Sequence, residues 1–249
     1  MESLFIGKHI IRLESVDSTN NYATAAIKSG EASHGSLIYA NFQEKGKGQR
    51  LNSWESEKGK NLLLSYVLTP NKLPSEKSFE LNFICSLAVK DFVSHLAIGH
   101  TVNIKWPNDI MLNGKKVAGV LIENALQSGK LKYSILGIGL NMNQKEFSYP
   151  SATSILKETK NVTDLELAIS LLSSYLEKWY LKLEAGKLND LILEYNSFLW
   201  KKNVLISAVF KGESTKLKLL NVDRFGLVQL EKDGEFYKAD FSELKIGYE

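Results

Sequence analysis

Apolar positions in the first half of the chain recur at two spacings, which predict both strands and helices. The runs "SLIYANF" (36–42) and "NLLLSYVL" (61–68) have the length and composition of buried strands. Segment 73–96 instead carries its apolar residues three and four positions apart, which predicts an amphipathic helix. Polar residues typical of a helix start precede residues 19–29, and Gly30 follows them, so this segment is expected to be a shorter helix.

Further strands are expected between residues 101 and 143. The first, 101–112, is broken by Pro107 and an Asn-Asp turn. Tight turns at "NGK" and "ALQSGK" bound the segments 116–124 and 131–143, which predicts an antiparallel hairpin. Strands and helices mixed in this order indicate an α+β chain.

The pattern changes again in the last third of the chain. Helical spacing runs from 163 to about 200, where Thr163 and Glu166 are expected to form a capping box at its start. Beyond residue 200 there are only short strands between turns, the spacing of a small all-β barrel. We therefore expect two domains, residues 1–200 and 201–249.

One segment between two predicted strands has no apolar period at all, "NFQEKGKGQRLNSWESEKGK" (41–60). The glycines of "GKG" (46–48) let backbone N–H groups approach a ligand, and Lys47 and Arg50 add positive charge. Trp54 offers a flat apolar face for a ring. The combination suits an anionic ligand with a heterocyclic group, although an exposed hairpin tip explains glycine and lysine at least as well.

Two other segments place polar groups where a ligand could bind. "VDSTN" (16–20) puts hydroxyl and amide groups at a helix start, where ordinary capping also explains them. In "KWPND" (105–109), a buried turn accounts for Pro, Asn and Asp but not for Lys105 at the end of an apolar strand. Lys116 likewise stands shortly before Gly119, whose missing side chain leaves room against the strand.

A last motif, "GIGLNMN" (137–143), alternates glycine with large apolar residues. Gly137 and Gly139 clear one face of the strand, and Asn141 and Asn143 continue that face. A Rossmann dinucleotide motif would need a third glycine and a following helix, so this strand is expected to be a wall against which something packs.

Composition narrows the classes of function. The chain has 249 residues, a formal net charge of +3 and a pI near 8.7, a weaker excess of positive charge than duplex-DNA binders usually carry. Its apolar runs are far shorter than the roughly 20 residues of a transmembrane helix. The first residues also lack the features of a signal peptide. We therefore expect a cytoplasmic protein that binds neither DNA nor membranes.

Cysteine and histidine chemistry is sparse. Cys85 is the single cysteine, so an intramolecular disulfide is excluded, and its apolar neighbours predict a buried side chain. His9, His34, His95 and His100 show no metal-ligand spacing, so no zinc site is expected.

Taken in order, these motifs resemble those of the biotin protein ligase family, from about Glu14 to the end of the chain. "KWPND" followed by Lys116 is the most specific part. The resemblance implies a class II synthetase-like α+β fold, a mixed β-sheet with helices packed on one side, plus a small C-terminal SH3-like β-barrel. It further implies that ATP and Mg²⁺ activate biotin as biotinyl-5′-adenylate. Biotin then passes to one lysine of a biotin carboxyl carrier protein.

The resemblance also assigns roles to the residues of the motifs. The residues assigned to biotin are Ser18, Thr19, Asn20, Gln43, Gly46, Lys116 and Gly119. The residues assigned to ATP or the adenylate are Lys47, Gln49, Trp54, Lys105, Asn108, Asp109 and Asn141. Catalysis is assigned to Lys116, Lys47 and Arg50, and a magnesium ion to Asp109.

The chain departs from the family pattern in two places. Gln49 stands where most members have an arginine directly after "GKG", and an arginine follows only at Arg50. Either the loop shifts its register, or Gln49 supplies only a neutral hydrogen bond, and in the second case weaker retention of the adenylate is expected. Only about a dozen residues precede "ESVDSTN", too few for an N-terminal DNA-binding domain, so the resemblance is to the monofunctional type. The sequence leaves the oligomeric state open between monomer and homodimer.

Two alternatives remain. The first is a lipoate–protein ligase or octanoyl transferase of the related fold, but the transferases use a cysteine nucleophile, and Cys85 lies far from every motif. The second is a non-catalytic nucleic-acid-binding module on the C-terminal barrel. Lysines there supply charge, whereas exposed aromatic stacking partners are sparse.

Overall fold

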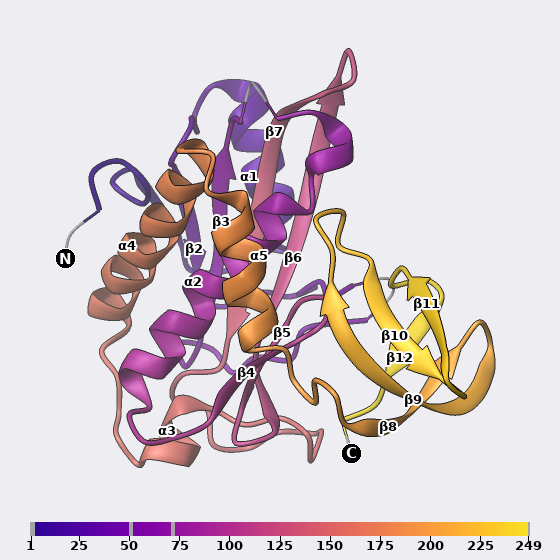
Figure 1. The fold of residues 1–249 in the computed structure, drawn as a ribbon. Helices are drawn as coiled ribbons and strands as arrows, with labels where there is room; N and C mark the ends of the chain where they lie inside the picture. The colour runs from indigo at the N-terminus through magenta and orange to yellow at the C-terminus, as the bar shows by residue number, and fades with distance from the viewer. Residues whose placement is uncertain (1–2, 50–51, 71–72, 249) are drawn as a thin grey trace.

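The computed structural model describes residues 3–49, 52–70 and 73–248 of the chain. Its larger part is a mixed sheet with the strand order β1-β2-β3-β7-β6-β5-β4 (Figure 1). The strands of this sheet are β1 (Ile10–Leu13), β2 (Leu37–Ala40), β3 (Leu62–Leu68), β4 (Val102–Lys105), β5 (Asp109–Leu112), β6 (Lys115–Gln127) and β7 (Lys130–Leu140). β1 and β2 run parallel, and the other neighbouring pairs are antiparallel.

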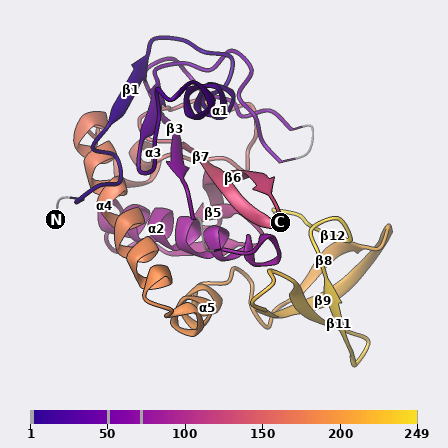
Figure 2. The same cartoon turned by 90° about the horizontal axis from the view of Figure 1, so that it is seen from above.

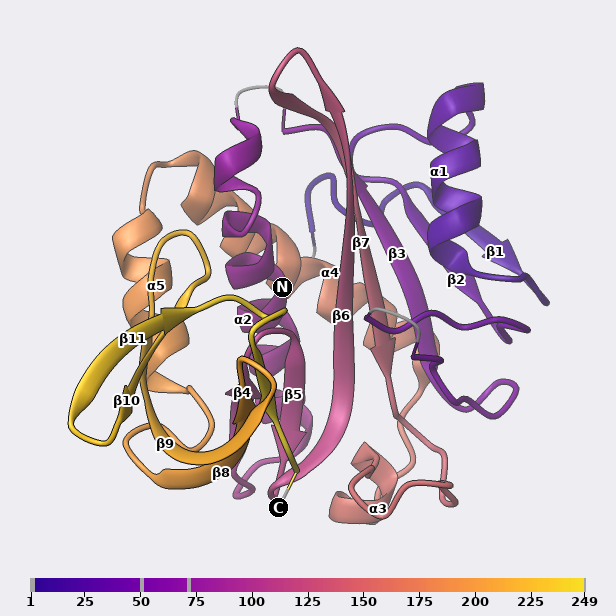
Figure 3. The same cartoon turned by 90° about the vertical axis from the view of Figure 1, so that its right-hand side faces the viewer.

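Helices cover both faces of this sheet. Three of them lie together on one face, α2 (Glu80–Leu96), α4 (Leu165–Glu184) and α5 (Leu188–Ser197) (Figure 2). α1 (Thr19–Ser29) lies on the opposite face (Figure 3). Two shorter elements, the 3₁₀ turn η1 (Ser75–Lys77) and α3 (Ile155–Thr159), complete the helices of the described residues. The predicted fold class is confirmed, and α1 adds a cover on the second face.

β3 shows how both faces come to be buried. Leu64 and Tyr66 belong to the large core beneath α2 and α4. Val67 points the other way and packs with Ala23 and Ala26 of α1. A strand covered on both faces needs no polar alternation, which explains the nearly continuous apolar run in this part of the sequence.

The strand register brings together motifs that are separate in the sequence. β6 and β7 form the predicted hairpin, in which Gly119 lies opposite Gly139. β5 pairs with the other edge of β6 and places Asp109 opposite Gly119. One row across three strands therefore holds an acidic residue and two glycines.

The ends of two helices differ from those expected. α2 begins at Glu80 and not near residue 73, because Pro74 has an extended backbone and residues 75–77 form a separate 3₁₀ turn. α4 is capped by Asp164, whose carboxylate accepts hydrogen bonds from the N–H groups of Glu166 at 2.9 Å and Leu167 at 3.1 Å. The expected capping box with Thr163 is therefore wrong.

The C-terminal part is a second, antiparallel sheet of five strands. The strands are β8 (Leu205–Phe210), β9 (Glu213–Val222), β10 (Val228–Lys232), β11 (Glu235–Ala239) and β12 (Leu244–Ile246). Their order is β11-β10-β9-β8-β12, and among the described residues β11 and β12 do not pair to close a barrel. Across the same residues, no helix is both long and apolar enough to span a membrane.

Specific contacts hold the small sheet against the rest of the chain. Trp106 Nε1 donates a hydrogen bond of 3.0 Å to the carbonyl oxygen of Gly226. The side chain of Asn196, at the end of α5, accepts from the N–H of Val222 at 2.7 Å and donates to its carbonyl oxygen at 2.9 Å. Apolar residues of the two sheets belong to one continuous core. The division of the chain at residue 200 stays a prediction.

We expect Asn196→Ala to destabilise the protein by about 2 kcal/mol, because a buried backbone N–H of Val222 loses its acceptor. The urea midpoint of unfolding measures this change. Ser197→Ala is the matched control, since the exposed Ser197 hydroxyl bonds only within its own helix. Equal midpoints for the two variants would contradict the role given to Asn196.

Candidate active site

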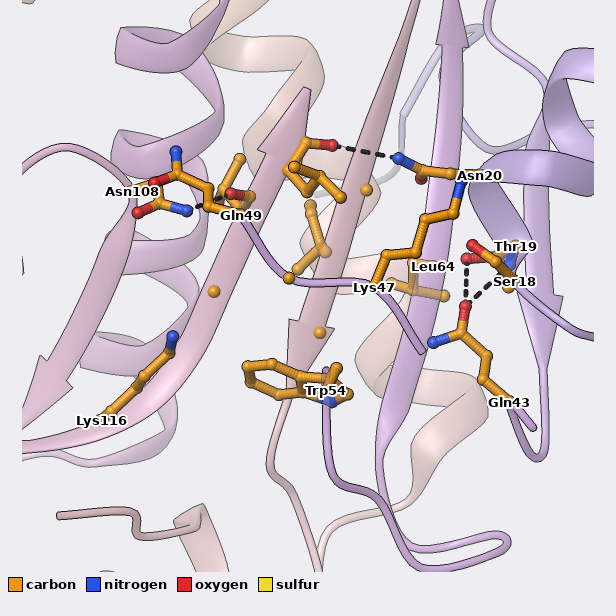
Figure 4. Close-up of a pocket in the computed structure, with 17 residues that line it drawn as sticks. Ser18, Thr19, Asn20, Gln43, Lys47, Gln49, Trp54, Leu64, Asn108 and Lys116 are labelled. Carbon is orange, nitrogen blue, oxygen red and sulfur yellow. Dashed lines mark hydrogen bonds between the residues drawn. The ribbon is translucent and has the colours of Figure 1, made fainter. Parts of the chain in front are cut away.

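A cleft lies on the α1 side of the sheet, over the glycines of β6 and β7 (Figure 4). It is lined by Ser18, Thr19, Asn20, Gln43, Lys47, Gly48, Gln49, Trp54, Leu64, Asn108, Lys116, Gly119, Val120, Leu121, Gly137, Ile138 and Gly139. A β-carbon built on Gly139 would lie 2.7 Å from Cδ2 of Trp54, and one on Gly119 would lie 3.1 Å from Cζ3. The cleared face predicted for this strand is confirmed, because only glycine admits the indole so close to the backbone.

One end of the cleft is a network of neutral polar groups at the start of α1. The side-chain oxygen of Gln43 accepts hydrogen bonds from the backbone N–H of Thr19 at 2.7 Å and from its hydroxyl at 3.0 Å. Ser65 Oγ lies 2.8 Å from Thr19 Oγ1 and 2.6 Å from Asn20 Oδ1. Gln43 thus caps the helix with its oxygen and turns its amide nitrogen toward the cleft (Figure 4).

The glycine-rich segment is a small hairpin that folds over the cleft. At its start, the N–H groups of Glu44 and Lys45 donate hydrogen bonds of 2.9 Å to the carbonyls of Val16 and Asp17, just before α1. Further along, the N–H of Trp54 donates to the carbonyl of Gly46 at 2.9 Å.

The close contact between the two arms of this hairpin explains the glycine at position 46. A β-carbon on Gly46 would lie 2.8 Å from the carbonyl oxygen of Trp54. The same contact holds the Trp54 indole over the glycines, where its buried Nε1 has no hydrogen-bond partner among the described residues.

The other end of the cleft is cationic and centres on the buried carboxylate of Asp109. Lys116 Nζ lies 2.6 Å from Asp109 Oδ1, and Lys105 Nζ lies 3.9 Å from Oδ2. Tyr248 donates a hydrogen bond of 2.6 Å to Oδ2. Burial lowers the pKa of Lys105 to about 8, although Asp109 opposes this shift.

The structure brings most of the predicted residues together. The assigned residues that line the cleft are Ser18, Thr19, Asn20, Gln43, Lys47, Gln49, Trp54, Asn108, Lys116 and Gly119. Gly46, Lys105 and Asp109 lie directly behind this lining. Asn141 donates to the carbonyl of Thr153 at 3.0 Å and is not part of the lining, and Arg50 lies outside the described residues. The roles assigned to all these side chains stay predictions.

Two residues of the site were not anticipated. Glu123 accepts a hydrogen bond from Asn20 at 2.7 Å, and its other oxygen lies 3.8 Å from Lys47 Nζ. Glu123 lies four residues after Gly119 on the same strand, and the side chains of a strand alternate between its two faces, so both residues belong to the same face. This period of two is the sequence signal that indicates Glu123. Ser65 is the only serine or threonine in the apolar run of β3, and its contacts with α1 depend on where that helix packs, which the sequence does not show.

The donor set fits a protein-held magnesium ion poorly. Both oxygens of Asp109 already accept from a lysine or a tyrosine. Within the described part of the chain, no group of three His, Cys, Asp or Glu side chains could hold a metal. A magnesium ion would therefore reach this site on the phosphates of a nucleotide, as part of a substrate.

Comparison with known proteins decides the family. The profile of the biotin/lipoate A/B protein ligase family matches residues 13–141, just over half of the chain, which contain the motifs of the cleft except the last two residues of "GIGLNMN" (137–143). The chain belongs to this family. The biotin–[acetyl-CoA-carboxylase] ligase of Paracoccus denitrificans is 33% identical over 181 residues, which cover 69% of this chain and 73% of that protein.

Two further comparisons, one with a protein sequence and one with a solved structure, cover nearly all of the chain. The bifunctional ligase/repressor BirA of Bacillus spizizenii is 27% identical over 247 residues, 97% of this chain and 75% of that protein. The biotin protein ligase from Aquifex aeolicus, solved in complex with biotin and ATP, has the same fold, with a TM-score of 0.81 at 24% identity. That comparison covers 96% of this chain and 99% of the other.

We expect Gly139→Ala to destabilise the protein by about 1–3 kcal/mol, because the new methyl group would collide with the Trp54 indole. Removing the indole in the double variant Gly139→Ala/Trp54→Ala should relieve this cost, as a double-mutant cycle of thermal unfolding measures. Ser134→Ala on the same strand is the control, since its buried hydroxyl has no partner among the described residues. Additive effects of the two substitutions would contradict the packing of Trp54 on Gly139.

The lowered pKa of Lys105 predicts a pH dependence of stability. The charged ammonium is disfavoured in the folded protein, so its cost is fully present below pH 8 and disappears as the pH rises toward the ordinary lysine pKa of 10.5. Wild type should therefore gain free energy of unfolding relative to Lys105→Met between pH 8 and 10, as urea titrations at each pH measure. A difference that does not change with pH would show that the pKa of Lys105 is not depressed.

Proposed function

We propose that this chain is an ATP-dependent biotin protein ligase. It joins biotin to ATP to give biotinyl-5′-adenylate and pyrophosphate, and then transfers biotin to a lysine of a biotin carboxyl carrier protein. The observation that carries the proposal is the cleft itself, a neutral hydrogen-bonding end and a cationic end joined by a strip of glycines. Membership of the family and relatives named as biotin ligases support it.

The two ends of the cleft suit the two ends of biotin. The ureido ring presents N–H donors and a carbonyl acceptor, and the network of Thr19 and Gln43 offers groups of both kinds. The thioether ring and acyl chain are apolar and need a shallow apolar strip, which Gly137 and Gly139 would provide once the Trp54 indole, packed on Gly139 in this structure, has moved aside. The carboxylate would then lie near the ammonium group of Lys116.

Adenylation of biotin brings negative charges together. A carboxylate oxygen attacks the α-phosphorus of ATP, the bond from that phosphorus to the bridging oxygen breaks, and pyrophosphate leaves. Positive charge fixed near the reacting atoms stabilises the transition state more than the separated reactants. Lys116 can supply this positive charge once its ammonium group leaves Asp109 and pairs with the substrate. Magnesium bound to the phosphates would supply further positive charge.

The second step needs an adenylate protected from water. The lysine amine of the carrier protein attacks the acyl carbon of the mixed anhydride, and AMP leaves. The hairpin that carries Lys47 and Trp54 covers the cleft, so we propose that it opens to admit ligands and closes over the adenylate. Gln49 lines the cleft in the position where an arginine is usual. If it supplies only a neutral hydrogen bond there, the adenylate would be retained less strongly.

The nucleotide would lie at the cationic end of the cleft. Trp54 would lie beside the adenine, and Lys47, Lys105 and Asn108 would contact the nucleotide. The partner would be a biotin carboxyl carrier protein in the cytoplasm, with the ligase acting as a monomer or a homodimer. Asn141 bonds to Thr153, so contact with the nucleotide would require it to turn.

Octanoyl transfer through a cysteine is disfavoured by the place of Cys85. The thiol is fully buried within α2, and burial raises its pKa, so it does not provide the reactive thiolate that such an enzyme needs. Lipoate has no ureido group, and the polar end of the cleft would leave hydrogen bonds unpaired with it.

Biotin-dependent exchange of labelled pyrophosphate into ATP tests the proposal. Exchange should occur with biotin and not with lipoate or octanoate, and Lys116→Ala should lower kcat/KM by about a hundredfold or more because it removes a charge close to the reacting atoms. Lys115→Ala is the control, since this neighbouring lysine is exposed. Exchange with lipoate alone would move the chain to the other branch of its family.

A further inference from the structure

Tyr248 follows β12 in the C-terminal segment and reaches the cationic end of the cleft. Its hydroxyl donates a hydrogen bond of 2.6 Å to Asp109 Oδ2. Lys116 Nζ lies 2.6 Å from the other oxygen, Oδ1. One buried carboxylate therefore joins the C-terminal segment, which ends beside β6 in Figure 3, to the lysine at the end of the cleft.

The aromatic ring of Tyr248 makes a second contact in the same cluster. Lys105 Nζ lies 3.6 Å from the centroid of the ring, the arrangement of a cation–π interaction. Burial, together with the negative charge of Asp109, raises the pKa of Tyr248, so the phenol stays protonated and acts as a donor. Ring and hydroxyl thus both have defined partners.

The hydroxyl changes how strongly Asp109 can hold Lys116. A buried carboxylate accepts hydrogen bonds at both oxygens. Lys105 Nζ, 3.9 Å from Oδ2, lies beyond hydrogen-bond distance, so without another donor the carboxylate would turn both oxygens toward Lys116. The bond from Tyr248 occupies Oδ2 and leaves Lys116 only Oδ1. An ammonium group held through a single carboxylate oxygen is easier to exchange for the negative charges of a substrate.

We propose that Tyr248 is a positioning residue for Lys116. By donating to Oδ2 of Asp109, Tyr248 keeps Lys116 at the end of the cleft on one carboxylate oxygen only. Lys116 can then leave Asp109 for the negative charges of a substrate. The small sheet thereby contributes to the reaction through its C-terminal segment, although it adds no residue to the lining of the cleft. The kinetic consequence rests on the proposed function, whereas the effect on Lys116 itself does not.

The first test measures Lys116 in the protein without ligands. Tyr248→Phe keeps the ring over Lys105 and removes only the hydroxyl. Acetylation of Lys116 by a limiting amount of acetic anhydride, read by mass spectrometry against the exposed Lys115, should be several-fold slower in this variant, because Asp109 then binds Lys116 with both oxygens. Tyr237→Phe is the control, since its hydroxyl donates to Glu235 within the small sheet.

The second test uses the exchange of pyrophosphate into ATP. Tyr248→Phe should lower kcat by about tenfold, the effect of one hydrogen bond to a charged group, and leave KM for biotin within about twofold. In an Asp109→Asn background the same substitution should change nothing further, because the carboxylate through which Tyr248 acts is gone.

The outcomes separate this proposal from the proposed function. Unchanged acetylation of Lys116 in Tyr248→Phe overturns it, and so does a lower melting temperature with no change in acetylation, which would give Tyr248 a structural role only. A wild-type protein that exchanges pyrophosphate with none of the acids contradicts the proposed function, and the acetylation rates then still decide the role of Tyr248.

Discussion

The pairing of Gly119 with Gly139 across β6 and β7 is the constraint on which the whole site depends. Glycine usually weakens a strand, because it gives up backbone entropy and offers no side chain to pack. Here the two missing side chains make a trough in the middle of a covered sheet, and the indole of Trp54 lies in it. The trough leads from the start of α1 to Lys116, so its two ends determine which ligand can fit.

The charges at the cationic end are held by partners inside the protein. Asp109 pairs with Lys116 and lies near Lys105, so neither lysine is a free cation in the structure described here. A ligand must replace these interactions, and only one that brings its own negative charge to the same place can do so without loss. This exchange favours a substrate that brings negative charges together at the reacting atoms. It also explains why a carboxylate stands in the middle of an otherwise cationic site.

Local pattern was enough to predict much of this molecule. The limits of α1, the hairpin of β6 and β7 and the cleared face of Gly137 and Gly139 each follow from neighbouring residues alone. β1 was missed, because "IIRL" is too short to show a period and becomes a strand only by pairing with β2. Asp164 was missed as a cap for a related reason, since two adjacent polar residues both suit that position.

The remaining features depend on contacts between distant segments. Gln43 could be assigned to a ligand by resemblance, but its role as the cap of α1 depends on the placement of the loop beside the helix. Tyr248 carries no signal in the sequence at all, because its partner Asp109 lies 139 residues away, on β5 of the larger sheet. A sequence pattern locates groups capable of chemistry, and only the fold shows which of them share a proton or a charge.

A crystal structure of the protein soaked with biotin and ATP would test the central claim most directly. The account predicts density for a biotinyl-adenylate along the glycine strip, with the ureido ring at Thr19 and Gln43. Lys116 Nζ should then have left Asp109 and lie within hydrogen-bond distance of the acyl phosphate. A ligand bound away from the glycine strip, or an adenylate in the cleft with Lys116 still on Asp109, would contradict it.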